Sequence, residues 1–181
     1  MLILASASPR RHELLLAAGL EHVVRAAHIP ETRLRREPAR TFVQRIAAEK
    51  ANAVSCTAGD IVLAADTVVC LDGDIFGKPA DPADAERMLR RLSGREHWVY
   101  TGICLRRDAK QIVDLAATRV SFLELSENEI SQYTRSGESS DKAGAYAIQG
   151  VASRYIAGID GCYQNVVGLP VSLVYKHLKQ L

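Results

Sequence analysis

Residues 1–11 are Met1-Leu-Ile-Leu-Ala-Ser-Ala-Ser-Pro-Arg-Arg11, and this stretch decides the fold class. The apolar run at residues 2–5 predicts a buried strand, the small polar residues after it predict a tight turn, and a helix is expected to begin near Arg10. Such a turn binds anions, because free backbone N–H groups and the helix dipole point into it. Arg10 and Arg11 add forked donors that suit phosphate oxygens. For this segment taken alone, the alternative is an ordinary strand–helix unit with solvated arginines.

The bulk composition predicts one soluble globular domain over residues 1–181, long enough for a hydrophobic core without disulfide bonds. Its apolar content of 48% and charged content of 24% are ordinary. The net charge of +2, from 23 basic and 21 acidic residues, excludes a strongly basic nucleic-acid binder but not a local basic patch. Residues 1–50 hold nine basic and five acidic residues, so the positive excess coincides with the predicted phosphate turn.

The four cysteines show neither C-x-x-C spacing nor pairing with histidines at zinc-ligand intervals, and the five histidines have no metal-ligand spacing either. The cysteine pattern does not demand an oxidising compartment. Only about five apolar residues precede the arginines, too few for a signal peptide, and no apolar run approaches the ~18 residues of a membrane span. We therefore expect a cytoplasmic protein that does not bind membranes.

Predicted strands alternate with predicted helices, which favours an α/β architecture. The predicted strands are residues 2–5, 22–27, 61–65, 68–71, 98–105 and 112–125. The predicted helices are residues 10–18, 38–53, 81–93, 126–137 and 170–181. We expect a tight hairpin turn at Asp72-Gly73-Asp74, and an antiparallel pair formed by 98–105 and 112–125. Asp81 and Ser126 are the predicted N-caps of their helices.

Asp66 is the residue best placed for catalysis. It follows the all-apolar run at residues 61–65, so we expect it at the carboxyl end of a central strand, where open α/β sheets place their ligands. Thr67 faces the other way if the strand continues, so one of the two could do chemistry while the other lines a pocket wall. The alternative is a strand-end aspartate that caps a neighbouring turn.

Three further charged residues could handle phosphate or metal. Glu31 lies in a polar loop, Lys50 near the end of the following helix, and Lys78 in Phe76-Gly-Lys-Pro79. Taken singly, each is more often a solvated charge. The same holds for the arginine cluster of Arg33, Arg35, Arg36 and Arg40, although such a cluster could attract a polyanion.

Gln149 lies between Ile148 and Gly150 at the end of a segment rich in small residues. Its amide offers both a donor and an acceptor, so it can match the edge of a nucleobase. Uracil and thymine present an N3–H donor beside an O4 acceptor, but the amide could also flip to suit cytosine. The alternative is a structural side chain bonded to loop backbone.

Six short motifs follow one another along the chain. They are Leu4-Ala-Ser-Ala-Ser-Pro-Arg-Arg11, Ala64-Ala-Asp-Thr67, Gly77-Lys-Pro79, Asp141-Lys-Ala-Gly-Ala-Tyr146, Ile148-Gln-Gly150 and Asn165-Val-Val-Gly-Leu-Pro170. Together they resemble the Maf-type nucleoside triphosphate pyrophosphatases. The stretch at residues 141–150 is similar to the branch that acts on dTTP and UTP, and differs from the branch that acts on 7-methyl-GTP.

The resemblance implies a fold, a reaction and roles for individual residues. The implied fold is an elongated mixed sheet flanked by helices with a deep central cleft, similar to inosine triphosphate pyrophosphatase. The implied reaction is hydrolysis of a nucleoside triphosphate to the monophosphate and pyrophosphate by a homodimer that requires Mg²⁺ or Mn²⁺. Asp66 matches the proton acceptor. The base-selecting positions match Arg11, Thr67 and Gln149, and the phosphate- and metal-handling positions match Ser6, Glu31, Lys50 and Lys78.

Our mechanistic hypothesis places the β- and γ-phosphates against the turn from Ser6 to Arg11, with Arg10, Lys50 and Lys78 offsetting their charge. The ion bridges phosphate oxygens and the carboxylates of Glu31 and Asp66, since hard oxygen ligands suit Mg²⁺ and Mn²⁺. Water then attacks the α-phosphorus. An ordinary aspartate, with a pKa near ~3.9, is a poor base at neutral pH. We favour water acidified by the metal over a raised pKa of Asp66, because nearby cations oppose an upward shift.

Three other functions stay open at this point. A nucleotide-binding regulator would bind without turnover, in keeping with the association of Maf proteins with arrest of septum formation. A Maf pyrophosphatase could instead prefer 7-methyl-GTP. A nucleic-acid binder could use residues 33–40, although a net charge of +2 gives little drive for it.

Overall fold

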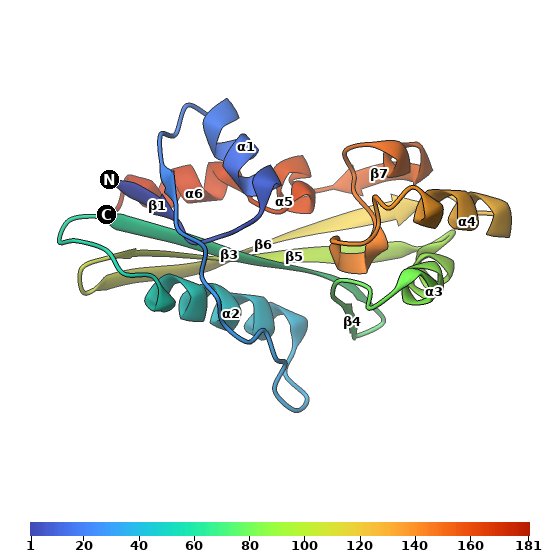
Figure 1. The fold of residues 1–181 in the computed structure, drawn as a ribbon, viewed down its shortest axis with the longest axis horizontal. Helices are drawn as coiled ribbons and strands as arrows, with labels where there is room; N and C mark the ends of the chain where they lie inside the picture. The colour runs from blue at the N-terminus through green and yellow to red at the C-terminus, as the bar shows by residue number, and fades with distance from the viewer. The chain divides into compact units, whose positions relative to one another are not determined.

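The computed structural model describes all residues from 1 to 181, and strands alternate with helices along most of its length (Figure 1). The strands are β1 Leu2–Leu4, β2 Val23–Val24, β3 Ile61–Leu71, β4 Asp74–Phe76, β5 Glu96–Arg107, β6 Lys110–Phe122 and β7 Ile156–Asp160. The α-helices are α1 Pro9–Ala17, α2 Ala39–Ala53, α3 Pro82–Leu92, α4 Glu127–Arg135, α5 Tyr163–Val167 and α6 Val171–Leu178. Two short 3₁₀ helices cover Ala143–Ala145 and Val151–Tyr155. None of the helices combines the length and apolarity that crossing a membrane requires.

The sheet is mixed, as expected. Its strand order is β2-β1-β3-β5-β6-β7, with β4 paired to β3. Strand β1 pairs in parallel with β2 and β3, whereas β4 pairs antiparallel with β3 and β7 with β6. The turn between β3 and β4 has positive φ at both Asp72 (52°) and Gly73 (86°), the backbone that a two-residue hairpin requires. The predicted mixed α/β fold and its hairpin are therefore confirmed.

The chain forms two compact units, which we describe separately. The first unit consists of Met1–Thr67, Tyr100–Ala116 and Gly168–Leu181, and the second of Val68–Val99 and Ala117–Val167. The sequence-based expectation of one domain stays a prediction, and so do the elongated shape and the deep cleft.

In the first unit, helices cover both faces of the sheet (Figure 1). Leu15 of α1 and Val174 of α6 belong to the apolar cluster of one face, together with Leu63 of β3. On the other face, Ala47 and Ala51 of α2 belong to a cluster with Ile3 of β1 and two alternate residues of β3, Val62 and Ala64. Burial on both faces explains why these strands are continuously apolar rather than alternating.

In the second unit, α3 and α4 bury their apolar sides against β5 and β6, with Leu89, Tyr133 and Phe122 in one cluster. Both helices begin where the sequence predicts. The Asp81 side chain accepts a hydrogen bond from Asp84 N at 2.8 Å. At α4, Ser126 Oγ accepts from Glu129 N (3.3 Å) and the Glu129 carboxylate accepts from Ser126 N (2.8 Å), which completes the capping box.

Strand β3 differs from the prediction, because it does not end before Asp66 but runs on to Leu71. The strand changes neighbours instead of stopping. Its parallel partner β1 ends at Leu4, opposite Leu63, and β4 pairs with it from Val69 onward. Asp66 therefore lies just past the end of β1, within its own strand. The predicted strand at 22–27 is also shorter, Val23–Val24, because β1 offers it only Ile3 and Leu4 as partners.

Candidate functional site

The turn after β1 has the form that the sequence predicts. The hydrogen bond from Ala5 N to Leu63 O (2.7 Å) is followed by the buried Ser6. Ser6 Oγ accepts from Ser8 N at 3.2 Å, and Pro9 opens α1. The side chain of Ser8, the N-cap residue, makes no capping hydrogen bond, so the first turn of α1 is not closed off by its own cap. The predicted turn and helix start are thus present.

Arg11 connects this turn to two distant parts of the chain. Its Nε donates to Gly168 O (2.8 Å), one terminal nitrogen to Ser6 Oγ (3.0 Å), and the other to Thr67 Oγ1 (3.1 Å). All three acceptors are neutral oxygens. A guanidinium has five N–H donors, so two are left over and the positive charge is not cancelled by a direct carboxylate partner.

Two residues that the sequence analysis missed complete this network. Thr101 Oγ1 lies 2.9 Å from Thr67 Oγ1, and Gly168 O accepts from Arg11 and lies 3.4 Å from Thr67 Oγ1. Gly168 belongs to one of the six motifs, so it could have been found. Nothing in a single sequence distinguishes Thr101 from other strand threonines.

On the other face of the sheet, Lys50 binds two carboxylates. Its Nζ lies 2.7 Å from Asp66 Oδ1 and 2.7 Å from Glu31 Oε1. Lys50 and Asp66 are both buried, whereas about half of the Glu31 side chain is exposed. Lys50 faces the sheet because it lies on the buried side of α2, which is formed by residues 42, 46, 47, 50 and 51.

Burial raises the pKa of Asp66 above its ordinary value, and the nearby charges of Lys50 and Arg11 oppose this shift without cancelling it. This corrects our expectation that the cations would prevent an upward shift. The cause is the depth of the carboxyl group, which is only 4% exposed, since desolvation penalises the charged form. A raised pKa makes the carboxylate a better proton acceptor near neutral pH.

Asp66 and Thr67 point to opposite faces of β3, as predicted for a strand that continues. Asp66 meets α2 through Lys50, and Thr67 meets α1 through Arg11. The two groups still share one electrostatic environment. Burial lowers the pKa of the Arg11 guanidinium, while the charges of Asp66 and Glu31 act in the opposite direction. The positive charge of Arg10, which is half-buried next to Arg11, also lowers the pKa of Arg11.

The structure thus brings six predicted residues of the first unit into two groups of three, on opposite faces of β3: Ser6, Arg11 and Thr67 on one face, and Glu31, Lys50 and Asp66 on the other. Lys78 and Gln149 belong to the second unit, and their convergence with the other residues stays a prediction. Both are exposed, and neither side chain has a hydrogen-bond partner within the protein. Lys78 follows Gly77, whose carbonyl accepts from Gly144 N at 3.0 Å.

A divalent ion fits the donor set of Glu31 and Asp66. Their oxygens already converge on one cationic atom, Lys50 Nζ, so the two carboxylates are arranged around a single positive charge. No group of three or more His, Cys, Asp or Glu side chains is arranged to hold a metal. Mg²⁺ sites in nucleotide-binding enzymes commonly use one or two carboxylates and take the remaining ligands from phosphates and water. The residues present therefore suit an ion that takes its other ligands from phosphate oxygens and water.

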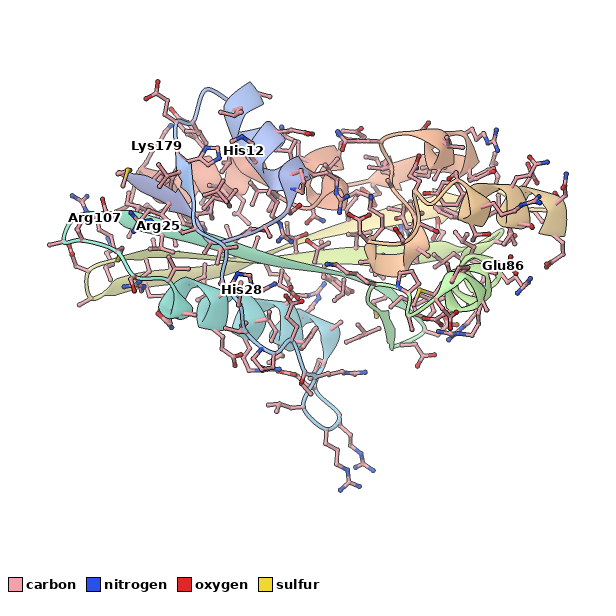
Figure 2. All side chains as sticks on the ribbon, viewed as in Figure 1. His12, Arg25, His28, Glu86, Arg107 and Lys179 are labelled. Carbon is pink, nitrogen blue, oxygen red and sulfur yellow. The ribbon has the colours of Figure 1, made fainter.

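Three members of the arginine cluster, Arg33, Arg35 and Arg36, lie in the loop before α2, which extends away from that helix in Figure 2, and Arg40 lies in the first turn of α2. Arg33 Nε donates to Glu37 O (2.7 Å), and Arg40 lies over the Tyr100 ring at 5.2 Å from its centroid. Arg35 and Arg36 are exposed and have no ion-pair partner. The loop therefore presents two solvated cations, Arg35 and Arg36, in agreement with the expectation that such charges are most often solvated.

Comparison with known proteins matches the whole chain, residues 1–181, to the family described as Maf-like protein. A dTTP/UTP pyrophosphatase of Koribacter versatilis is 49% identical over 180 residues, which cover 99% of this chain and 93% of that protein. A second dTTP/UTP pyrophosphatase, from Anaeromyxobacter dehalogenans strain 2CP-C, is 51% identical over 175 residues, covering 94% of this chain and 89% of that protein.

Two solved structures have a similar fold. The Ham1 protein of Staphylococcus aureus superposes with a TM-score of 0.58 at 13% identity, covering 99% of this chain and 98% of that one. A HAM1 protein from Coxiella burnetii gives a TM-score of 0.55 at 15% identity, with the same coverage. At this level of identity the likeness concerns the fold alone, and it agrees with the α/β architecture described above.

Proposed function

Because this chain belongs to the Maf family, as its six motifs indicated, we propose that it hydrolyses dTTP and UTP to the monophosphate and pyrophosphate. One observation carries the proposal beyond the likeness to named pyrophosphatases. A buried carboxylate with a raised pKa, Asp66, lies just past the end of β1, on the strand whose next residue binds Arg11 of the anion-binding turn. A proton acceptor beside a phosphate site is what hydrolysis of a phosphoanhydride requires.

In the proposed reaction, the oxygen of water attacks the α-phosphorus, the bond from this phosphorus to the bridging oxygen of the β-phosphate breaks, and pyrophosphate leaves. Asp66 accepts the proton of the attacking water. Its Oδ1 is already held by Lys50, and its Oδ2 accepts no hydrogen bond from the protein, so Oδ2 is the available atom. The two unused donors of Arg11 bind phosphate oxygens, and Lys50 limits the repulsion between Asp66 and the anionic substrate.

Glu31 and Asp66 would hold Mg²⁺ or Mn²⁺ together with the substrate phosphates. When bound, the ion neutralises phosphate charge and lowers the pKa of coordinated water. Lys50 lies between the same two carboxylates, so it keeps their charge compensated before substrate binds. This compensation allows two acidic groups to stay within reach of one another in the free protein.

We propose that Gln149 reads the N3–H and O4 edge of the pyrimidine, with Thr67 and Arg11 contributing to base selection. Support comes from the exposed Gln149 amide, which has no partner in the protein and is free to bind a ligand. Lys78, also exposed, would offset phosphate charge. A homodimer and a cytoplasmic location, where nucleoside triphosphates are abundant, belong to the same proposal.

The test is pyrophosphate release from a panel of nucleoside triphosphates in the presence of Mg²⁺ or Mn²⁺. We expect UTP and dTTP to be hydrolysed fastest, turnover to stop on chelation with EDTA, and Asp66→Asn to bind UTP while releasing no pyrophosphate. Faster hydrolysis of 7-methyl-GTP than of UTP would contradict the assignment of substrate. Binding without release from any nucleotide would favour a regulatory protein instead.

A further inference from the structure

One pair of side chains, Tyr133 and Glu138, holds the backbone on both sides of Gln149. The N–H of Ala147, two residues before Gln149, donates to Tyr133 Oη at 3.2 Å. The N–H of Val151, two residues after it, donates to Glu138 Oε2 at 3.2 Å. The short segment that carries Gln149 is therefore fixed at both ends by groups outside it.

The two holding groups are also bonded to each other, because Tyr133 Oη donates to Glu138 Oε1 at 3.0 Å. The Tyr133 ring is buried on α4 and packs edge-to-face against the Tyr155 ring, with 6.0 Å between the two ring centroids. Burial raises the pKa of the Tyr133 phenol, so the hydroxyl keeps the proton that it donates to Glu138. Tyr133 and Glu138 thus form one hydrogen-bonded pair that connects the core to the backbone on both sides of Gln149.

Gly150, which directly follows Gln149, allows Glu138 to come this close. A Cβ at position 150 would lie 2.8 Å from Glu138 Oε2, and the φ of +97° is one that side chains other than glycine rarely adopt. Glu138 itself is aimed by the turn that ends α4, where Gly137 has a φ of +78° and Ser136 Oγ accepts from Glu138 N at 3.3 Å. Two glycines thus permit one carboxylate to meet the backbone beside Gln149.

The Gln149 side chain is not held in place by contacts of its own, since it is exposed and makes no hydrogen bond within the protein. A protein binds its ligand more weakly when the recognising polar group is mobile, because ordering that group on binding costs conformational entropy. The hydrogen bonds that hold the backbone on either side of Gln149 therefore constrain the place of its amide before a nucleotide binds.

We infer that Tyr133 and Glu138 are positioning residues that fix Gln149 for recognition of the pyrimidine base. The inference rests on the proposed function, in which Gln149 contacts the base. It adds two residues that lie outside the six motifs and outside every role assigned above.

The experiment compares kcat/KM for UTP with kcat/KM for ribose 5′-triphosphate, which offers the same phosphates without a base. The ratio of the two values measures the contribution of the base. We expect Tyr133→Phe to lower this ratio about tenfold through a higher KM for UTP, with kcat and the hydrolysis of ribose 5′-triphosphate nearly unchanged. Glu138→Ala should do the same, and Glu138→Gln, which keeps the shape and one carbonyl acceptor, should recover part of the loss.

Tyr155→Phe is the matched control, because it removes a hydroxyl from the neighbouring ring, one that contacts Arg154 and Glu129 rather than the Gln149 segment. We expect this variant to keep the ratio of the unmodified protein. An equal fall in the ratio for Tyr155→Phe would show general loosening of the core and would overturn the inference. If Tyr133→Phe does not fold, Glu138→Ala, which alters a half-buried side chain, carries the test.

Gln149→Ala separates this inference from the proposed function. If Gln149→Ala leaves the ratio unchanged, the role of Gln149 in base selection is wrong. If Gln149→Ala lowers the ratio but Tyr133→Phe and Glu138→Ala do not, the positioning role alone is wrong. We expect Tyr133→Phe to cause no further fall in a protein that already carries Gln149→Ala, since the hydroxyl acts through Gln149.

Discussion

At the scale of single residues, Lys50 is the centre of the charged side of the site. Its ammonium group lies 2.7 Å from both Asp66 and Glu31, and it is itself buried at the end of α2. A buried ion pair gives little net stability, but removal of one partner leaves an uncompensated charge in a dry environment. The arrangement therefore makes the folded protein depend on Lys50 even before substrate binds.

Lys50→Met tests this dependence. We expect the free energy of unfolding, measured by urea denaturation at pH 7, to fall by about 3 kcal/mol, because Asp66 loses its buried counter-charge. Replacing the carboxylate as well, in Lys50→Met with Asp66→Asn, should restore most of the loss. A Lys50→Met protein as stable as the original would show that the pair is well solvated.

The contacts of Asp66 and Arg11 differ in how far the sequence alone could predict them. The alternation of a strand predicts that Asp66 and Thr67 face opposite ways, and they do. The sequence does not predict that Lys50, 16 positions before Asp66, reaches it, because that contact depends on how α2 packs on the sheet. Nor does it reveal how deeply Asp66 is buried, which is what raises its pKa.

At the scale of elements, α2 rests directly on β5 at Gly102. A Cβ at this position would lie 2.4 Å from the carbonyl carbon and oxygen of Val43, atoms of the helix backbone that cannot move aside without the helix. The glycine is required here by close approach rather than by its φ, which is not positive. Since α2 also carries Lys50, this contact sets the position of a site residue.

Gly102→Ala should therefore displace α2. We expect a loss of about 3 kcal/mol in the free energy of unfolding, typical of severe overpacking, and a parallel fall in kcat/KM as Lys50 moves. Gly158→Ala, on β7, is the control, since no atom lies within 4 Å of a Cβ there and its φ is not positive. An unchanged stability for Gly102→Ala, measured beside this control, would refute the close contact.

The elements themselves were largely predictable where a local signal exists. The N-caps Asp81 and Ser126 mark the starts of α3 and α4 because their side chains bond the first turn of the helix. The end of β3 was not predictable, because an apolar strand continues for as long as a neighbour pairs with it, and β4 provides one from Val69 onward. Pairing of this kind is a property of the sheet and not of the strand.

At the scale of the whole molecule, the alternating pattern of the sequence predicts the α/β architecture, and the motifs predict the family and, through that resemblance, the mixed sheet. The sequence does not predict that the chain forms two compact units, because three of the four boundaries fall inside β3, β5 and β6, where composition does not change, and the fourth directly follows α5. A boundary within a strand leaves no linker and hence no local signal. The predicted site is correspondingly divided, with Asp66 in the first unit and Gln149 in the second.

Acid stability of the whole protein depends on a histidine that the site does not use. His97 is buried in the second unit, with Nε2 2.8 Å from Tyr146 Oη and with Nδ1 lacking any partner. Burial lowers the pKa of His97 from 6.5 to about 4. The folded protein therefore holds this ring neutral at pH values where the unfolded chain has already protonated it.

The sign of the pH dependence follows from this difference. Between pH 6.5 and about 4 the unfolded state binds one more proton than the folded state, so the free energy of unfolding falls as the pH falls. A difference of about 2.5 pKa units corresponds to about 3 kcal/mol, reached near pH 4. Urea denaturation between pH 6.5 and 4 should show this fall in the free energy of unfolding for the original protein. The His97→Phe variant should not show the fall, although loss of the hydrogen bond to Tyr146 lowers its stability at neutral pH. His28→Gln, a change at an exposed histidine in the loop before α2 (Figure 2), should keep the fall, and parallel profiles for the original protein and His97→Phe would exclude His97 as its source.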